Sequence, residues 1–123
     1  MAITSAICTS FKVEILKGVH DFTASSGNTF NLALYTSDAS LGASTTAYTT
    51  SNEESGSGYT AKGNALTSVT PVADSTTAVC DFADTSFTSA SFTARGCMIF
   101  NDSATGDPAV CVIDFGSDKT VTS

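Results

Sequence analysis

The spacing of apolar residues changes at Gly18, and this change limits most strongly how the chain can fold. Before Gly18, apolar residues recur every four positions, at Ile3, Ile7, Phe11 and Ile15. That spacing is typical of one face of an amphipathic helix. Gly18 suits the position just after a helix, because it lacks a Cβ and adopts left-handed backbone angles freely. The pattern predicts one helix over residues 5–17.

After Gly18 the pattern has a period of two, which is typical of half-buried strands. Residues 29–36 alternate apolar and other side chains most clearly. Further strands are predicted at 45–51, 59–62, 65–72, 77–82, 91–100 and 109–115, with one more beginning at 120. The fold class is therefore mainly β: a single domain over residues 1–123, built as an antiparallel β-sandwich or jelly-roll-like barrel with one N-terminal amphipathic helix.

The alternation predicts which side chains are buried. The expected core is Ile7, Phe11, Ile15, Phe30, Leu32, Leu34, Phe82, Ile99, Cys111 and Ile113. Residues 97–100 and 109–113 are apolar on both faces, whereas the outer face of a small antiparallel sheet is usually polar. Either the helix or another subunit covers that outer face. In the second case the contact residues are expected to be Met98, Phe100, Val110 and Val112.

Charge and hydropathy exclude two classes of partner. The chain has 12 acidic and 5 basic residues among 123, a net charge of -7. Nucleic-acid-binding proteins need a basic surface for the phosphates, so we expect no nucleic-acid partner. No apolar run approaches the roughly 20 residues of a membrane-spanning helix. No basic segment precedes an apolar one at the N-terminus, so we expect synthesis and retention in a cytoplasm.

Residues with catalytic or metal-binding chemistry are sparse. His20 is the only histidine, and no Gly-x-Ser-x-Gly motif is present. We expect His20 to be structural rather than paired with Asp21 or a serine. The turn at residues 101–107 offers several oxygens, either as a weak calcium site or as a plain turn, but it lacks the ligand pattern of an EF-hand. The chain is therefore expected to be non-enzymatic, with no catalytic residue, cofactor or metal.

The four cysteines, at positions 8, 80, 97 and 111, form no Cys-x-x-Cys motif. Their neighbours are apolar, so we expect buried, reduced thiols, with a Cys97–Cys111 disulfide as the alternative. Arg95 is the only arginine and is expected at an edge or in an ion pair with Asp81, Asp84 or Asp114.

Several segments of the chain resemble small structural proteins of tailed bacteriophages. They are ICTSFK at 7–12, LKGVHDF at 16–22, ALYT at 33–36, NE at 52–53, GYT at 58–60, FTARG at 92–96 and DFGS at 114–117. The resemblance covers nearly the whole chain and implies a virion component with no known catalytic residues. It also implies a further β segment after residues 119–122, where this chain stops.

Within a virion, we expect a capsid decoration (cement) protein that stabilises the shell through protein contacts. The alternatives are a tail or fibre component and, third, a small sugar-binding module. Serine and threonine make up 38 of the 123 residues, a composition that suits a domain assembled in many copies. The expected partners are copies of itself, as a homotrimer, and the major capsid protein or tail proteins. Assembly is expected in the host cytoplasm, with the loop at residues 52–58 exposed to solvent.

Overall fold

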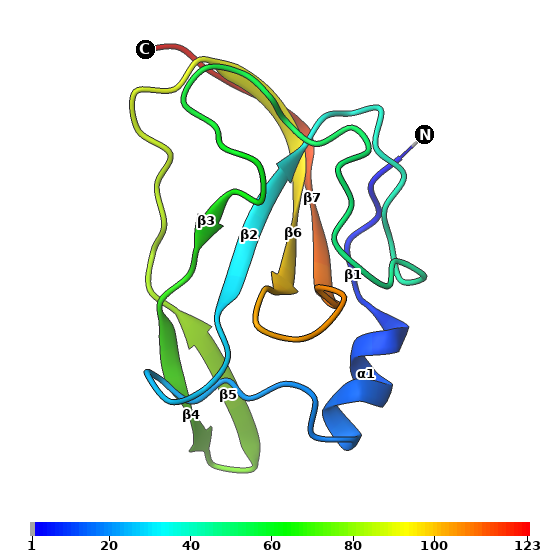
Figure 1. Ribbon diagram of the computed structural model, residues 1–123, viewed down its shortest axis with the longest axis vertical. Helices are drawn as coiled ribbons and strands as arrows, with labels where there is room; N and C mark the ends of the chain where they lie inside the picture. The colour runs from blue at the N-terminus through cyan, green and yellow to red at the C-terminus, as the bar shows by residue number, and fades with distance from the viewer. Residues whose placement is uncertain (1) are drawn as a thin grey trace.

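The computed structural model describes residues 2–123 and is mainly β, with antiparallel sheets and one short N-terminal helix (Figure 1). The fold class predicted from the sequence is confirmed as a β-sandwich-like arrangement. The elements are β1 (Ala6–Ile7), α1 (Thr9–Leu16), β2 (Phe30–Tyr35), β3 (Asn64–Ala65), β4 (Ser68–Asp74), β5 (Thr77–Phe82), β6 (Phe92–Asn101) and β7 (Ala109–Val121). A five-stranded sheet has the order β1-β7-β6-β2-β3, and β4 and β5 form a separate hairpin.

The first face of the five-stranded sheet is buried beneath the chain's own loops. In the register of β2, β6 and β7, Ala33 lies opposite Met98, which lies opposite Val112. These side chains pack with Ile3 and Leu41, which come from the N-terminal segment and from the loop after β2. Irregular segments, rather than a second sheet, therefore cover this face.

The second face is only partly covered. Here Leu32, Ile99 and Cys111 follow one another across the sheet, and all three are half-buried. The covering side chains come from α1, from the segment after it and from the hairpin: Phe11, Phe22 and Phe82. Because both faces carry apolar partners, the strands are apolar on both sides.

The predicted helix is correct in place but wrong in length. Residues 6–7 pair with β7 as a short strand, with Ile7 opposite Cys111. Cys8 has extended backbone angles, and its N–H donates to the Val110 carbonyl at 3.0 Å. The helix therefore begins at Thr9, because the edge of β7 binds the preceding backbone in an extended form. The four-residue periodicity runs through a strand and a helix that share one apolar side.

The predicted strands agree with the structure where alternation is strong. Strand β5 matches its prediction, while β2 and β6 match theirs closely. The predicted strands at 45–51 and 59–62 are wrong, since these residues lie in loops and turns, and the one predicted at 65–72 is found as β3 and β4. The strand predicted from residue 120 is the end of β7, which continues through Gly116 and pairs Thr120 with Thr93.

The predicted core is right for two residues, partly right for five and wrong for three. Phe30 and Leu34 are buried. Phe11, Leu32, Phe82, Ile99 and Cys111 are half-buried. The prediction is wrong for Ile7, Ile15 and Ile113, which are exposed by 49%, 40% and 41%. The deepest large side chains are instead Tyr35, Phe30, Phe100 and Met98. Three of these four, Tyr35, Phe100 and Met98, belong to the first face. Alternation therefore predicted which side chains share a face of the sheet, but not which face lies deeper.

Candidate functional site

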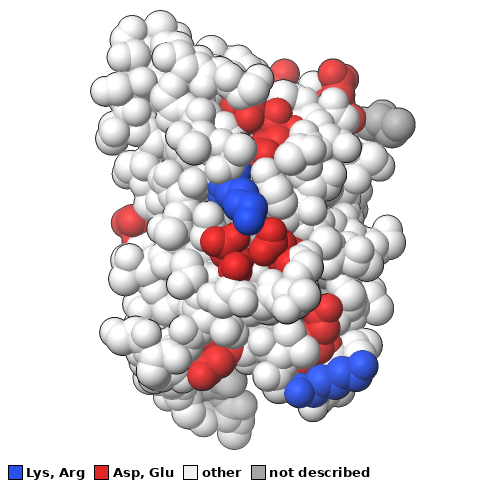
Figure 2. Space-filling model, viewed as in Figure 1, with Lys and Arg blue, Asp and Glu red and all other residues white. Residues whose placement is uncertain are grey.

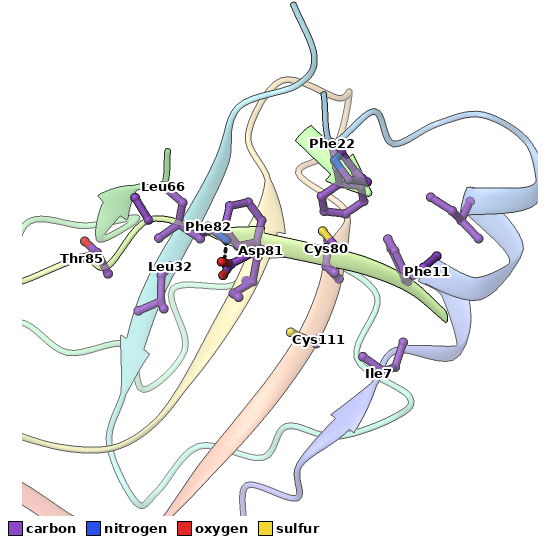
Figure 3. Close-up of a pocket in the computed structure, with 16 residues that line it drawn as sticks. Ile7, Phe11, Phe22, Leu32, Leu66, Cys80, Asp81, Phe82, Thr85 and Cys111 are labelled. Carbon is purple, nitrogen blue, oxygen red and sulfur yellow. Dashed lines mark hydrogen bonds between the residues drawn. The ribbon is translucent and has the colours of Figure 1, made fainter. Parts of the chain in front are cut away.

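An apolar pocket of about 660 Å³ lies between the second face of the sheet, the β4–β5 hairpin and α1 (Figure 3). Sixteen residues line it, and only Asp81 and Thr85 among them have an oxygen in the side chain. Figure 3 shows Phe11 and Ile7 at one end of the pocket and Leu66 and Thr85 at the other. The pocket therefore extends across the strands of the sheet.

Both oxygen-bearing side chains in the wall already have hydrogen-bond partners within the chain. Asp81 Oδ1 accepts a hydrogen bond from the N–H of Phe82 at 2.8 Å. Thr85 Oγ1 accepts one from Asn64 Nδ2 at 3.0 Å. The pocket thus offers mainly carbon surface, with one carboxylate and one hydroxyl in its wall.

Aromatic packing forms the end of the pocket beside α1. The rings of Phe22 and Phe30 stack with centroids 4.2 Å apart and an interplanar angle of 7°. Phe82 lies 5.8 Å from Phe30, and Phe11 lies 6.0 Å from Phe22. Offset and edge-to-face aromatic pairs add to the stability gained from burial. This wall is held by packing from four separate segments.

His20 lies behind this aromatic wall and has a structural environment. Its side chain is buried, with Nε2 3.0 Å from Glu14 Oε1 and Nδ1 3.1 Å from Asn101 Nδ2. Its sequence neighbour Asp21 instead accepts a hydrogen bond from the N–H of Thr23. His20 therefore joins α1 to the end of β6, and the structure pairs it with neither Asp21 nor a serine.

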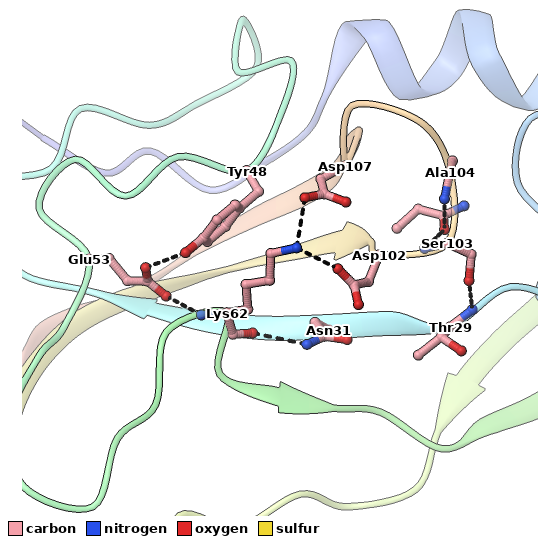
Figure 4. A network of polar contacts seen from close by, with 10 residues as sticks. Thr29, Asn31, Tyr48, Glu53, Lys62, Asp102, Ser103, Ala104 and Asp107 are labelled. Atoms are coloured by element: carbon pink, nitrogen blue, oxygen red, sulfur yellow. Dashed lines mark hydrogen bonds and ion pairs between the residues drawn. The ribbon is translucent and has the colours of Figure 1, made fainter.

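The acidic turn after β6 binds a lysine (Figure 4). Lys62 Nζ lies 2.9 Å from Asp102 Oδ1 and 3.0 Å from Asp107 Oδ2. Hydrogen bonds to Asp102 and then Asp107 raise the pKa of Lys62. The ammonium group thus lies where a calcium ion would need to bind both carboxylates. Within residues 2–123, no cluster of three metal-ligating side chains is present.

Glu53 is the centre of a second polar network, so the prediction that the whole of loop 52–58 is exposed is wrong. Its carboxylate accepts hydrogen bonds from the hydroxyls of Tyr48 and Tyr59 and from the N–H of Lys62. Burial, followed by the hydrogen bond to Glu53, raises the pKa of Tyr48 to about 12. Glu53 and Glu54 are half-buried, and Glu53 forms an isolated bridge with Tyr35. In the sequence, the sign of this network was the position of Tyr48 and Tyr59 on either side of Glu53.

Arg95 is paired with one of its three predicted partners. Its Nε donates to Asp114 Oδ1 at 2.8 Å across the β6–β7 ladder. The hydrogen bond from Arg95 lowers the pKa of Asp114, with a smaller contribution from the N–H of Gly116. The pair lies at a register shift between Ala94 and Gly96, where the two strands are locally irregular. It is an ion pair within the sheet rather than a binding group.

The four cysteines are free in the structure, but they are not equally buried. Cys8 and Cys97 are buried as predicted, Cys111 is half-buried, and Cys80 is exposed, which corrects the prediction for that residue. Burial raises the pKa of Cys8 to about 11 and that of Cys97 to about 12. Cys80 and Cys111 both line the pocket, one on the hairpin and one on β7 (Figure 3).

We expect Cys80 to react first with a thiol reagent. Alkylation needs an accessible thiolate. Partial burial raises the pKa of Cys80 too, but of the four cysteines only Cys80 is exposed. N-ethylmaleimide at pH 8 should label Cys80 at least about tenfold faster than Cys8 or Cys97. Peptide mass spectrometry at timed quench points measures the rates, and urea-unfolded protein is the control in which the rates converge. Equal labelling of Cys8 and Cys80 in the native protein would contradict this.

The predicted interface residues are not available for contact with another subunit. Met98 and Phe100 have no exposed surface, Val112 is 1% exposed, and Val110 is 7% exposed. The chain's own loops bury the first three, and the aromatic wall of the pocket buries Val110. The prediction is wrong because segments of this chain itself cover these four side chains.

Several of the exposed apolar side chains lie on α1 and on the hairpin. We call Val13, Leu16, Val69, Val72 and Val79 the apolar end; they are exposed by 50%, 89%, 45%, 62% and 39%. Figure 1 shows α1 and the hairpin at the same end of the molecule, away from the C-terminus. Figure 2 shows one cluster of charged side chains in the middle of this face, with further charged side chains at its upper and lower ends.

Comparisons with known proteins add no relative: no protein-family model, no curated protein and no solved structure matches the chain. The helix found within residues 2–123 is too short to cross a membrane.

Proposed function

We propose that the protein is a non-enzymatic structural subunit of a tailed-phage particle, where it decorates the capsid shell by binding through apolar contact area. The observation that carries this proposal is the apolar end, where five aliphatic side chains are at least 39% exposed. Apolar surface gathered at one end of a protein commonly marks a protein–protein contact. The resemblance to phage structural proteins is the reason for proposing a phage particle as the partner.

The polar side chains support the same proposal. His20, Glu53, Lys62 and Arg95 are each bound to groups within the chain. These groups therefore stabilise the fold. The three tyrosine hydroxyls are hydrogen-bonded within the chain as well.

The hairpin adds a reason for contact with a partner. A two-stranded sheet is marginally stable alone, and β4–β5 carries exposed valines on one face and the pocket on the other. Association with copies of itself, as a trimer on a local three-fold axis of a shell, would cover these valines. Obligate interfaces commonly bury about 2,000 Å² or more, largely apolar.

We expect the purified protein to self-associate and to remain associated in about 0.5 M salt, where the screening length is a few ångströms. Sedimentation velocity measures this. Val72→Asp, in the apolar end, should shift the protein towards monomer, whereas Thr122→Asp, the same charge change at the opposite end, should not. A wild-type monomer without affinity for capsid shells or tail tubes would contradict the proposal.

The position within the particle is tested by copy number. Quantitative mass spectrometry of purified virions should give hundreds of copies for a shell protein. Tens of copies or fewer would instead support the tail or fibre alternative. No copies in the virion would reject both.

A further inference from the structure

We propose that the apolar pocket binds a single uncharged aliphatic chain, such as a long-chain alcohol or the hydrocarbon part of a neutral lipid. This inference does not depend on the phage proposal, because none of the five residues of the apolar end lines the pocket. It rests on the size, the shape, the wall chemistry and the charge of the pocket.

The size of the pocket matches a small ligand. Its volume of about 660 Å³ lies within the roughly 300–1,000 Å³ of typical ligand sites. At about 30 Å³ for each methylene-sized group, the volume of a water molecule in the liquid, a chain of about 12 carbons fills roughly half of it. A single chain thus has room without displacing the hairpin.

The shape favours a chain over a compact ring. Figure 3 places Phe11 and Ile7 at one end of the pocket and Leu66 and Thr85 at the other, with Leu32 and Cys111 along the floor. A flexible aliphatic chain can follow this path and contact the side chains along it. The half-exposed Ile7 at 49% gains cover when the pocket is filled.

The wall chemistry and the charge exclude an ionised ligand group inside the pocket. The Asp81 carboxylate is an acceptor that repels an anion, and Thr85, which accepts a hydrogen bond from Asn64, offers the one hydroxyl donor of the lining. The protein carries a net charge of -7, and Asp81 adds a carboxylate to the wall itself. Burying an unpaired charge is strongly unfavourable, so a neutral alcohol should bind better than the carboxylate of the same length.

The binding test is a chain-length series measured by isothermal titration calorimetry below the solubility limit of each alcohol. From 1-octanol to 1-decanol to 1-dodecanol, each pair of added methylenes should tighten binding about tenfold, as expected for buried CH₂ groups. Decanoate at pH 8 should bind at least about tenfold more weakly than 1-decanol. Affinity that is independent of chain length, or an equal affinity for decanoate, would overturn the proposal.

The location is tested by thiol protection and by filling the pocket. Bound 1-decanol should slow labelling of Cys80, which lines the pocket, at least fivefold at saturation. Ala78→Trp places a ring in the pocket wall and should weaken 1-decanol binding at least tenfold. Its matched control is Thr77→Trp, since Thr77 precedes Ala78 in β5, points to the other face of the hairpin and does not line this pocket.

Binding without protection of Cys80, or equal weakening by both tryptophan variants, would overturn the pocket as the site. Should Ala78→Trp fail to fold, the wild-type protection experiment and the alcohol series still decide. Loss of alcohol binding with self-association intact would reject this inference and leave the proposed function standing. Monomeric protein that binds the alcohols would do the reverse.

Discussion

Phe30→Ala is expected to lower the free energy of unfolding by about 3–5 kcal/mol, in the range of buried Phe truncations. Phe30 has no exposed surface and stacks on Phe22, with Phe82 and His20 also around it. Removing the ring leaves a cavity between the β4–β5 hairpin and the sheet, so the hairpin packs less tightly on the sheet. The melting temperature should fall by about 10–20 °C. Urea unfolding followed by circular dichroism measures the change.

The control for this prediction is Leu16→Ala, which removes a large apolar side chain that is 89% exposed. It should change stability by less than about 0.5 kcal/mol. Phe22→Ala, alone and combined with Phe30→Ala, measures the coupling between the two stacked rings. A Phe30→Ala protein as stable as Leu16→Ala would show that the aromatic wall does not hold the hairpin.

Glu53→Ala is expected to destabilise the protein by about 3–4 kcal/mol. The change leaves three donors without their acceptor: the hydroxyls of Tyr48 and Tyr59 and the N–H of Lys62. Hydrogen bonds to a charged acceptor contribute about 1.5–3 kcal/mol each, and a donor stranded in a partly buried site costs about 1–3 kcal/mol. Water entering the half-exposed loop reduces the total below the simple sum.

The matched control is the neighbouring acid. Glu54 Oε1 accepts hydrogen bonds only from the adjacent N–H groups of Ser55 and Gly56, and its Oε2 has no partner. Glu54→Ala should therefore cost about 1 kcal/mol or less.

A second readout follows the tyrosines. We expect absorbance at 295 nm to show ionisation of Tyr48 with a pKa of about 12 in the wild type. This pKa should shift downward in Glu53→Ala, because the carboxylate that disfavours the phenolate is gone. An unchanged titration together with unchanged stability would contradict the network.

The strands with strict alternation were predictable from the sequence. Strand β2 was found within a residue at each end, with Phe30, Leu32 and Leu34 at alternate positions on one face of the sheet. Strand β5 was found where predicted, although its residues are nearly all exposed. The residues of 45–51 are also β-branched, yet they form a loop with the isolated bridge Ala47–Pro108. β-propensity reports fit to a half-buried surface and does not select the neighbouring strand.

The pocket could not be predicted from the sequence. Its walls combine α1, the segment near Phe22, the hairpin and β7. A single sequence does not show that these segments lie next to one another in the fold. The same limit applies to Lys62, which binds Asp102 and Asp107 about forty residues away. The Arg95–Asp114 pair was within reach because both residues lie on strands that were predicted, and three acids were weighed as partners.

By itself, the sequence determined the class of the fold, the place of the helix and the position of the strongest strands. It did so because periodicity is a local property of the chain, set by which side chains avoid water. Tertiary structure alone decided which face of the sheet lies deepest and where the apolar surface remains open. The segments around Ile3 and Leu41 cover Met98, Phe100 and Val112, while the hairpin only partly covers the other face. Which covering segment reaches which face depends on long-range packing and on the open edge of β7, which holds Ala6 and Ile7 in a strand.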